Sequence, residues 1–180
     1  MSASSSTTLP PELLPLLQRD QPETQLPPLR PQKPFSSTHK SIISTPTFPV
    51  PVIAILHLLN DDLTSAHSLV QDDDSNMDSN LIHSILHRRE GDFWNSKWWL
   101  DRFSHPFLDQ LYAERGMKGR KGAKQFVDLV ERLTSNKGGA VTACAAQRDV
   151  NEAKNWQWKE HSSLATYLFR KYDVAPPTSR

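Results

Sequence analysis

The feature that most constrains the fold is a short pattern that occurs twice, 30 residues apart. Ile-Leu-His at residues 55–57 returns at residues 85–87, and each copy is followed by an acidic turn that contains Asp62 or Asp92. A small residue follows four positions after each of these aspartates. An apolar helix, a tight turn with a capping aspartate and a second helix with a small residue near its start are typical of a helical hairpin. The repeat therefore predicts two stacked helical hairpins.

The rest of the chain after residue 50 also has helical periodicity, and no alternating strand pattern runs longer than four residues. Repeat arrays usually need about three stacked units, so we expect the C-terminal helices to cap the two hairpins. The predicted fold is an all-α, tetratricopeptide-like array of helical hairpins with about seven helices. After the hairpins, helices are expected over about residues 106–114, 125–133, 140–147 and 152–172, with a flexible basic loop over 116–122.

Prolines divide the chain into regions, because ten of the 14 lie within the first 50 residues. Proline fixes φ and removes a backbone donor, so regular helix or sheet is not expected in this stretch. We predict a disordered Pro/Ser-rich tail over residues 1–49, a single helical domain over 50–174 and a disordered C-terminus over 175–180. Within the tail, Pro28-Leu-Arg-Pro31 has the spacing of a polyproline ligand.

Composition excludes several classes of function. The net charge is +1, and the one basic cluster, over residues 118–124, lacks a phosphate-loop pattern, so neither nucleic acid nor a charged membrane is an expected partner. No apolar stretch approaches the roughly 20 residues that span a bilayer. The single cysteine, Cys144, is expected to act as a small buried hydrophobic residue. With no secretory signal and no disulfide framework, the expected location is cytoplasmic or nuclear, not secreted.

A group of polar residues on the first helix of the second repeat is the main candidate for a functional site. His83, His87 and Glu90 follow i, i+4, i+7 spacing and share a helix face away from the apolar residues. Two histidines at i, i+4 with a nearby carboxylate are a possible metal-ligand arrangement, to which His57 and His67 add ligands if they fold inward. The alternative is a solvated polar face, since the zinc-protease pattern His-Glu-x-x-His is absent.

The charged residues that follow have a structural and a functional interpretation. Arg88 and Arg89 lie where cations favour a helix C-terminus, and Asp92 lies where a carboxylate favours the next N-terminus. The functional alternative is a buried pair between Arg89 and Glu90 that anchors the hairpin or grips an anion.

Three tryptophans of the next helix also have two interpretations. Trp94, Trp98 and Trp99 are expected to pack in the core or at the hairpin interface. The alternative is a stacking wall, in which an exposed tryptophan beside Asn95 marks a binding groove.

The string from His87 to Trp99, followed by Arg102 and His105-Pro106, resembles an uncharacterised family of small helical proteins from bacteria and fungi. The shared motif is His-Arg-x-Glu-Gly-Asp-x-x-Asn-Ser-x-x-Trp with a following His-Pro. More distantly, the hairpins resemble tetratricopeptide repeats, although the offset is shorter than the usual 34 residues and the first copy lacks the glycine of the second. The resemblance implies no activity, but it directs attention to seven positions: His87, Arg88, Glu90, Asp92, Asn95, Trp98 and His105.

These observations predict a non-catalytic helical-repeat module, or an accessory subunit, that binds a protein or peptide partner. The alternative is a small-molecule-binding or metal-assisted enzyme centred on His83, His87, Glu90 and His105. No catalytic residue is assigned and no cofactor is predicted for the first interpretation. The second interpretation predicts zinc or another divalent metal bound by His83, His87 and Glu90.

Overall fold

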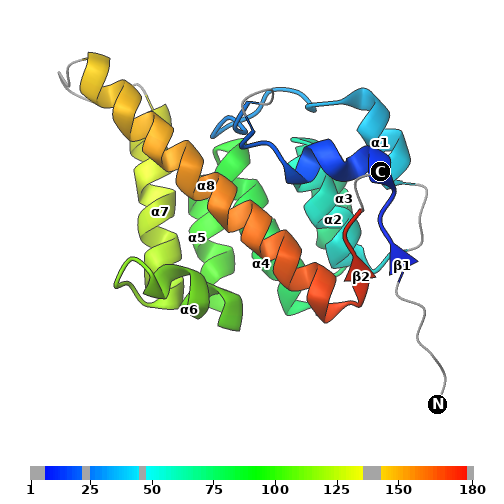
Figure 1. Cartoon of the computed structure of the whole chain (residues 1–180). Helices are drawn as coiled ribbons and strands as arrows, with labels where there is room; N and C mark the ends of the chain where they lie inside the picture. Colours follow the sequence, from blue (N-terminus) through cyan, green and yellow to red (C-terminus); the bar gives the residue numbers. More distant parts are fainter. Residues whose placement is uncertain (1–6, 22–24, 45–47, 136–142, 178–180) are drawn as a thin grey trace.

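A computed structural model of the chain describes residues 7–21, 25–44, 48–135 and 143–177. The described part is mainly helical, which confirms the all-α fold class (Figure 1). Its elements in chain order are β1 (Thr7–Thr8), the 3-10 helix η1 (Pro11–Leu17), α1 (Ser37–Ile43), α2 (Val50–Leu59), α3 (Leu63–Gln71), α4 (Met77–Glu90), α5 (Phe93–Arg102), α6 (Pro106–Ala113), α7 (Gly119–Thr134), α8 (Ala143–Lys171) and β2 (Val174–Ala175). In these ranges no helix is both long and apolar enough to cross a membrane.

The repeated pattern forms two consecutive hairpins, α2–α3 and α4–α5, which pack on each other through α3 and α4. Just after each first helix lies a residue with a left-handed backbone, Asp61 (φ 57°) in one copy and Gly91 (φ 91°) in the other. The side chains of Asp62 and Asp92 then accept a hydrogen bond from the backbone N–H three residues later. Aspartate tolerates the left-handed region better than most residues, so the first copy makes the same turn without a glycine.

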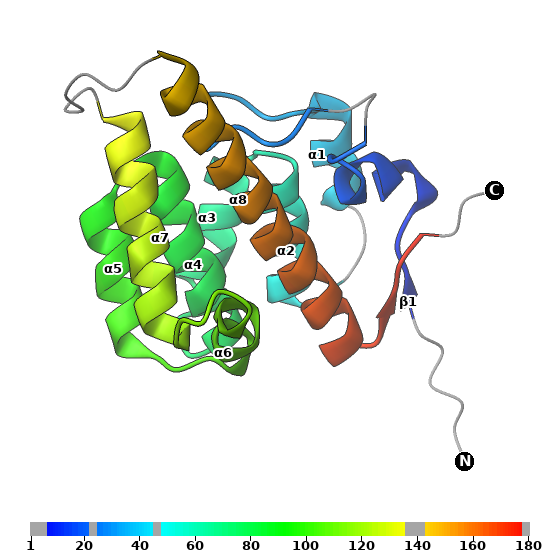
Figure 2. The same cartoon turned by 60° about the vertical axis from the view of Figure 1, so that its left-hand side comes forward.

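The long helix α8 crosses the hairpins diagonally and closes the core, with α6 and α7 beside it (Figures 1 and 2). The two helices expected over 140–147 and 152–172 are one helix from Ala143 onward, while residues 140–142 lie outside the described part. The side chain of Cys144 also lies outside it, so its predicted burial stays a prediction.

The expected flexible loop over 116–122 is a helix from Gly119 onward. Its glycines allow close packing of α6 on α7. A Cβ added at Gly122 would lie 2.5 Å from Cδ1 of Tyr112, which is too close for any side chain at that position.

The N-terminal segment differs from the disordered tail that was expected over residues 1–49. Leu9, Leu13 and Leu16 are buried in the core. The strand β1 pairs in parallel with β2, with Thr7 opposite Val174. Prolines prevent a long α-helix here, but a 3-10 helix places side chains three residues apart on one face. The leucines of η1 therefore pack against the helical domain, so the packed unit begins before residue 50. It also extends past residue 174, because Pro177 is buried.

A buried ionic cluster ties this segment to the hairpins. Asp61 accepts hydrogen bonds from Arg19 (2.7 Å) and from Arg89, and the three side chains are 3%, 3% and 0% exposed. Arg89 also donates to the backbone carbonyl of Pro28 at 3.2 Å. The alternative of an Arg89–Glu90 pair is therefore corrected: Asp61 is the partner of Arg89, because the turn of the first hairpin faces the end of α4.

A second buried pair joins α4 to α8. Arg88 forms a bidentate ion pair with Glu160, which also accepts a hydrogen bond from Tyr112 at 3.2 Å. His161 lies beside these groups without a hydrogen-bond partner, and burial together with the nearby arginines holds its pKa well below the ordinary 6.5. His161 is therefore neutral, and the arginines carry the positive charge of this layer.

Candidate metal site

Three imidazoles from two neighbouring helices meet beside the turn of the second hairpin. His67 comes from α3, and His83 and His87 come from successive turns of α4. One ring nitrogen from each can be chosen so that all three lie within 4.8 Å of one another. We call His67, His83 and His87 the histidine cluster.

Local sequence accounts for the positions of two of the three histidines. The i, i+4 spacing places His83 and His87 one above the other on α4, with ring centroids 4.8 Å apart. His67 joins them only because α3 packs against α4, which brings its Nε2 to 3.0 Å from Nε2 of His83. The other histidine considered as a ligand, His57, lies instead beside Asp62, with Nδ1 3.2 Å from Oδ2.

The cluster is partly enclosed rather than part of a solvated polar face. Every residue of α4 from Asp78 to Arg89 is buried, since α2, α3 and α5 pack around the helix. Trp99 stacks on His83 with ring centroids 4.3 Å apart and covers one side. The side chain of His67 is 25% exposed, so the cluster opens to solvent at that residue.

Carboxylates lie behind two of the imidazoles. Glu90 Oε1 is 2.8 Å from Nδ1 of His67, and Oε2 is 3.5 Å from Nδ1 of His87. Asp92 Oδ2 lies 3.8 Å from the same His87 nitrogen. In metal sites a carboxylate at one ring nitrogen typically orients the imidazole and leaves the other nitrogen for the metal.

The protonation states differ within the cluster. Burial, together with the charges of His67 and His87, lowers the pKa of His83 to about 3. Burial also lowers the pKa of His87, and the charge of His67 adds to this. The hydrogen bond to Glu90 raises the pKa of His67 above 6.5. His83 and His87 are thus neutral at pH 7, the form that binds a metal, whereas His67 holds a proton more strongly.

The other residues highlighted by the sequence are not part of this cluster. Arg88 points to Glu160, and Asn95 Nδ2 donates to Asp92 at 2.6 Å. His105 caps α6 and contacts Asp78 at 2.9 Å, so it belongs to a separate buried site. The aromatic helix α5 does not place all its tryptophans in the core. Trp94 is 70% exposed, and Trp98 is 39% exposed with the guanidinium of Arg102 over its ring.

A polar cleft of about 320 Å³ adjoins the cluster at Glu90. It lies between the segment 30–34 and the turns at 61–64 and 89–90. No feature of the sequence indicated this cleft, because its first wall belongs to the segment that was expected to be disordered.

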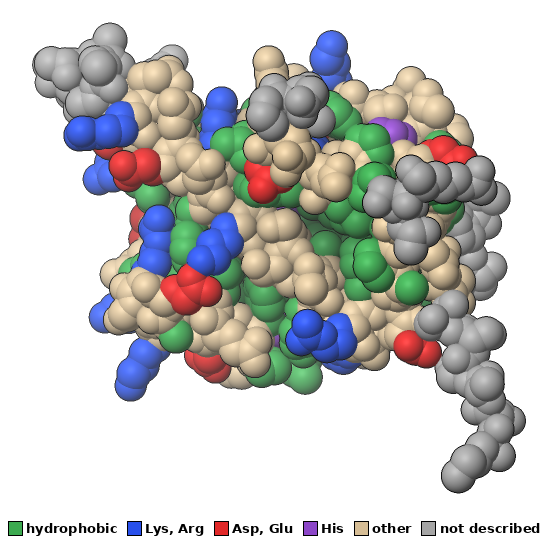
Figure 3. Space-filling view, viewed as in Figure 1, with side chains coloured by type: hydrophobic (Ala, Val, Ile, Leu, Met, Phe, Trp, Pro, Cys, Tyr) green, Lys and Arg blue, Asp and Glu red, His purple; other side chains and the backbone are tan. Residues whose placement is uncertain are grey.

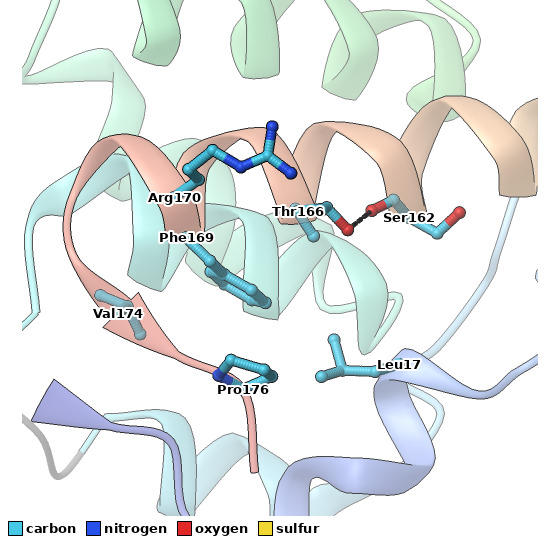
Figure 4. Close-up of a pocket in the computed structure, with 8 residues that line it drawn as sticks. Leu17, Ser162, Thr166, Phe169, Arg170, Val174 and Pro176 are labelled. Atoms are coloured by element: carbon cyan, nitrogen blue, oxygen red, sulfur yellow. Dashed lines mark hydrogen bonds between the residues drawn. The ribbon is translucent and has the colours of Figure 1, made fainter. Parts of the chain in front are cut away.

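An apolar pocket of about 290 Å³ lies elsewhere, between η1, α8 and β2 (Figure 4). Leu17, Phe169 and Val174 line it, and the hydroxyl of Thr166 is used within α8, where it donates to the carbonyl of Ser162 at 2.9 Å. Hydrophobic side chains gather on the surface around this region, and most of the charged side chains on this face lie further away, over α6 and α7 (Figure 3). The chemically distinctive groups of the described chain are therefore at the histidine cluster and its cleft.

Comparison of the chain with protein-family models, with curated proteins and with solved structures finds no match.

Proposed function

We propose that the protein binds a divalent transition-metal ion through His67, His83 and His87. The observation that carries this proposal is the convergence of three imidazoles, with potential ligand atoms within 4.8 Å of one another. Imidazole suits zinc, copper, nickel and iron, and three protein ligands leave a coordination position for water or another ligand.

The surroundings of the cluster support the same proposal. Among the described residues, Nδ1 of His83 is buried and has no hydrogen-bond partner, which is costly for a polar atom in a folded protein. Glu90 lies where an outer carboxylate orients His67 and His87.

The test is a titration of the full chain with Zn²⁺ and with Co²⁺ at pH 7.5, followed by calorimetry and by tryptophan fluorescence. We expect saturable binding of one ion and a fluorescence change, because Trp99 stacks on His83. His67→Gln should weaken binding at least about 100-fold, since loss of outer-shell partners alone costs 10- to 100-fold. This variant is chosen because His67 is the most exposed ligand, so the fold should survive.

His39→Gln is the matched control, because His39 lies on α1 outside the cluster. It should bind Zn²⁺ like the unmodified chain. Affinity should also rise as the pH increases through neutrality, because the ion must displace a proton from His67. Absence of binding by the unmodified chain, or equal binding by His67→Gln, would contradict the proposal.

A second candidate function is a tetratricopeptide-like module that binds a peptide. Two features favour it: the repeated hairpins, and the exposed Trp94 and Trp98 one turn apart on α5. Because Arg102 lies over Trp98, the matching partner is a peptide with an apolar residue next to an acidic one.

Selection from a peptide library on the purified chain tests this second function. Selected peptides should lose at least tenfold in affinity for the double variant Trp94→Ser/Trp98→Ser and none for Met77→Ser, an exposed apolar control on α4. Peptides that bind all three proteins equally, or an enriched pool without acidic residues, would exclude it.

A further inference from the structure

The cleft beside the histidine cluster has an uneven charge balance. Its three acidic residues are already paired: Asp61 binds Arg19 and Arg89, Asp62 lies 3.3 Å from Nζ of Lys40, and Glu90 lies 2.8 Å from Nδ1 of His67. Asp61 and Asp62 are almost fully buried, and the side chain of Glu90 is 31% exposed. They therefore contribute little free negative charge to the cleft.

Two cations of the same cleft keep unused donors. The guanidinium of Arg30 donates to the backbone carbonyl of Glu90 at 3.1 Å, but its buried Nε has no hydrogen-bond partner. Lys33 is exposed, and within the described ranges no carboxylate pairs with it. Thr64 adds a hydroxyl to the lining. The cleft thus presents donors without matching acceptors.

We propose that this cleft binds a small acidic molecule, with a carboxylate or phosphate group held between Arg30 and Lys33. Arginine and lysine are the side chains that most often bind such groups, and their hydrogen bonds are strengthened by charge. The volume of about 320 Å³ is at the lower end of the range for small-ligand sites. The acidic group would lie next to Glu90.

The cleft and the histidine cluster are connected through this one residue. Arg30 binds the Glu90 carbonyl, while the Glu90 side chain holds His67 at 2.8 Å. An anion that binds Arg30 would therefore affect Glu90, the residue that orients the proposed metal ligands His67 and His87. Anion and metal should therefore change each other's affinity by the same factor. This coupling rests on the proposed metal site, whereas the anion site itself does not.

The experiment is calorimetric titration of the full chain at low salt with sulfate, a tetrahedral dianion like phosphate, and with succinate, a dicarboxylate. Lys33→Ala should weaken binding of the preferred anion about tenfold, the loss expected for one charge-assisted contact. Lys33 is exposed, so this change should leave the fold intact. Lys121→Ala, which removes an exposed lysine on α7, should have no effect. The preference between sulfate and succinate identifies the acidic group.

Each outcome separates the two proposals. Binding that depends on Lys33 but is unchanged by saturating Zn²⁺ supports the anion site and rejects its coupling to the metal. Binding that depends on Lys33 in a chain that binds no Zn²⁺ supports the anion site and overturns the proposed function. No binding of either anion up to about 20 mM, far weaker than charge-assisted contacts in a cleft provide, overturns the anion site. Equal binding by Lys33→Ala also overturns it.

Discussion

Asp61→Asn is expected to destabilise the protein by about 3–5 kcal/mol, the largest effect of any single change considered. Asp61 is the only carboxylate among the described residues that pairs with Arg19 and Arg89, and both arginines are almost fully buried. Removing its charge leaves two buried guanidinium groups uncompensated. Asparagine keeps the size of the side chain and tolerates the left-handed backbone at this position, so the variant isolates the charge. Urea unfolding followed by circular dichroism measures the difference.

Asp101→Asn is the control for this prediction. Asp101 pairs with Lys124 at the surface, where ion pairs contribute at most about 1 kcal/mol. We expect its unfolding midpoint to stay close to that of the unmodified chain. If Asp61→Asn were as mild as the surface change, the buried cluster would not be a determinant of stability.

Asp78→Asn is expected to have the second-largest effect and to change the acid sensitivity of the protein. Burial alone would raise the pKa of Asp78, but hydrogen bonds from His105, Lys171 and Tyr172 outweigh it and lower the pKa from 3.8 to about 2. The folded state therefore binds a proton less readily than the unfolded state. The resulting stabilisation, about 2 kcal/mol at about 1.4 kcal/mol per pKa unit, is fully present above pH 3.8 and is lost as the pH falls towards 2.

Unfolding free energies measured between pH 2 and 7 test this prediction. The variant should lose about 2 kcal/mol at pH 7 and show a flatter dependence between pH 4 and 2. Asp128→Asn removes an exposed carboxylate that pairs with Lys97, and its profile should match that of the unmodified chain. Parallel profiles for Asp78→Asn and the unmodified chain would contradict the assigned role of Asp78.

Asp78 also illustrates how tertiary contacts assign roles that local sequence does not reveal. The sequence alone places His105 with His83 and His87 among the candidate functional residues. In the structure its Nε2 donates to Asp78, near the end of α8, while its Nδ1 accepts from the backbone N–H of Phe107 and caps α6. The His-Pro pair therefore has a sufficient structural explanation: a buried cap at the start of a helix.

The candidate site was predictable only where its residues share one helix. His83 and His87 come together through the geometry of a single α-helix, which depends on spacing alone. His67 lies 16 positions before His83, and only the packing of α3 on α4 decides that its ring faces inward. The solvated polar face proposed as the alternative did not arise, because α4 is the most enclosed of the hairpin helices.

The hairpins, their capped turns and the all-α class were readable from the repeat, because hydrogen bonds and caps within a helix involve residues at most a few positions apart. Three features could not be predicted from the sequence: the packing of the N-terminal segment, the pairing of Arg19 and Arg89 with Asp61, and the position of His67. Each joins residues distant in the chain, and the free energy of such contacts depends on which surfaces the folded helices leave uncovered. The proline content predicted no regular helix or sheet before residue 50, whereas the short elements β1, η1 and α1 form there, and it carried no information about the leucines that the assembled core buries.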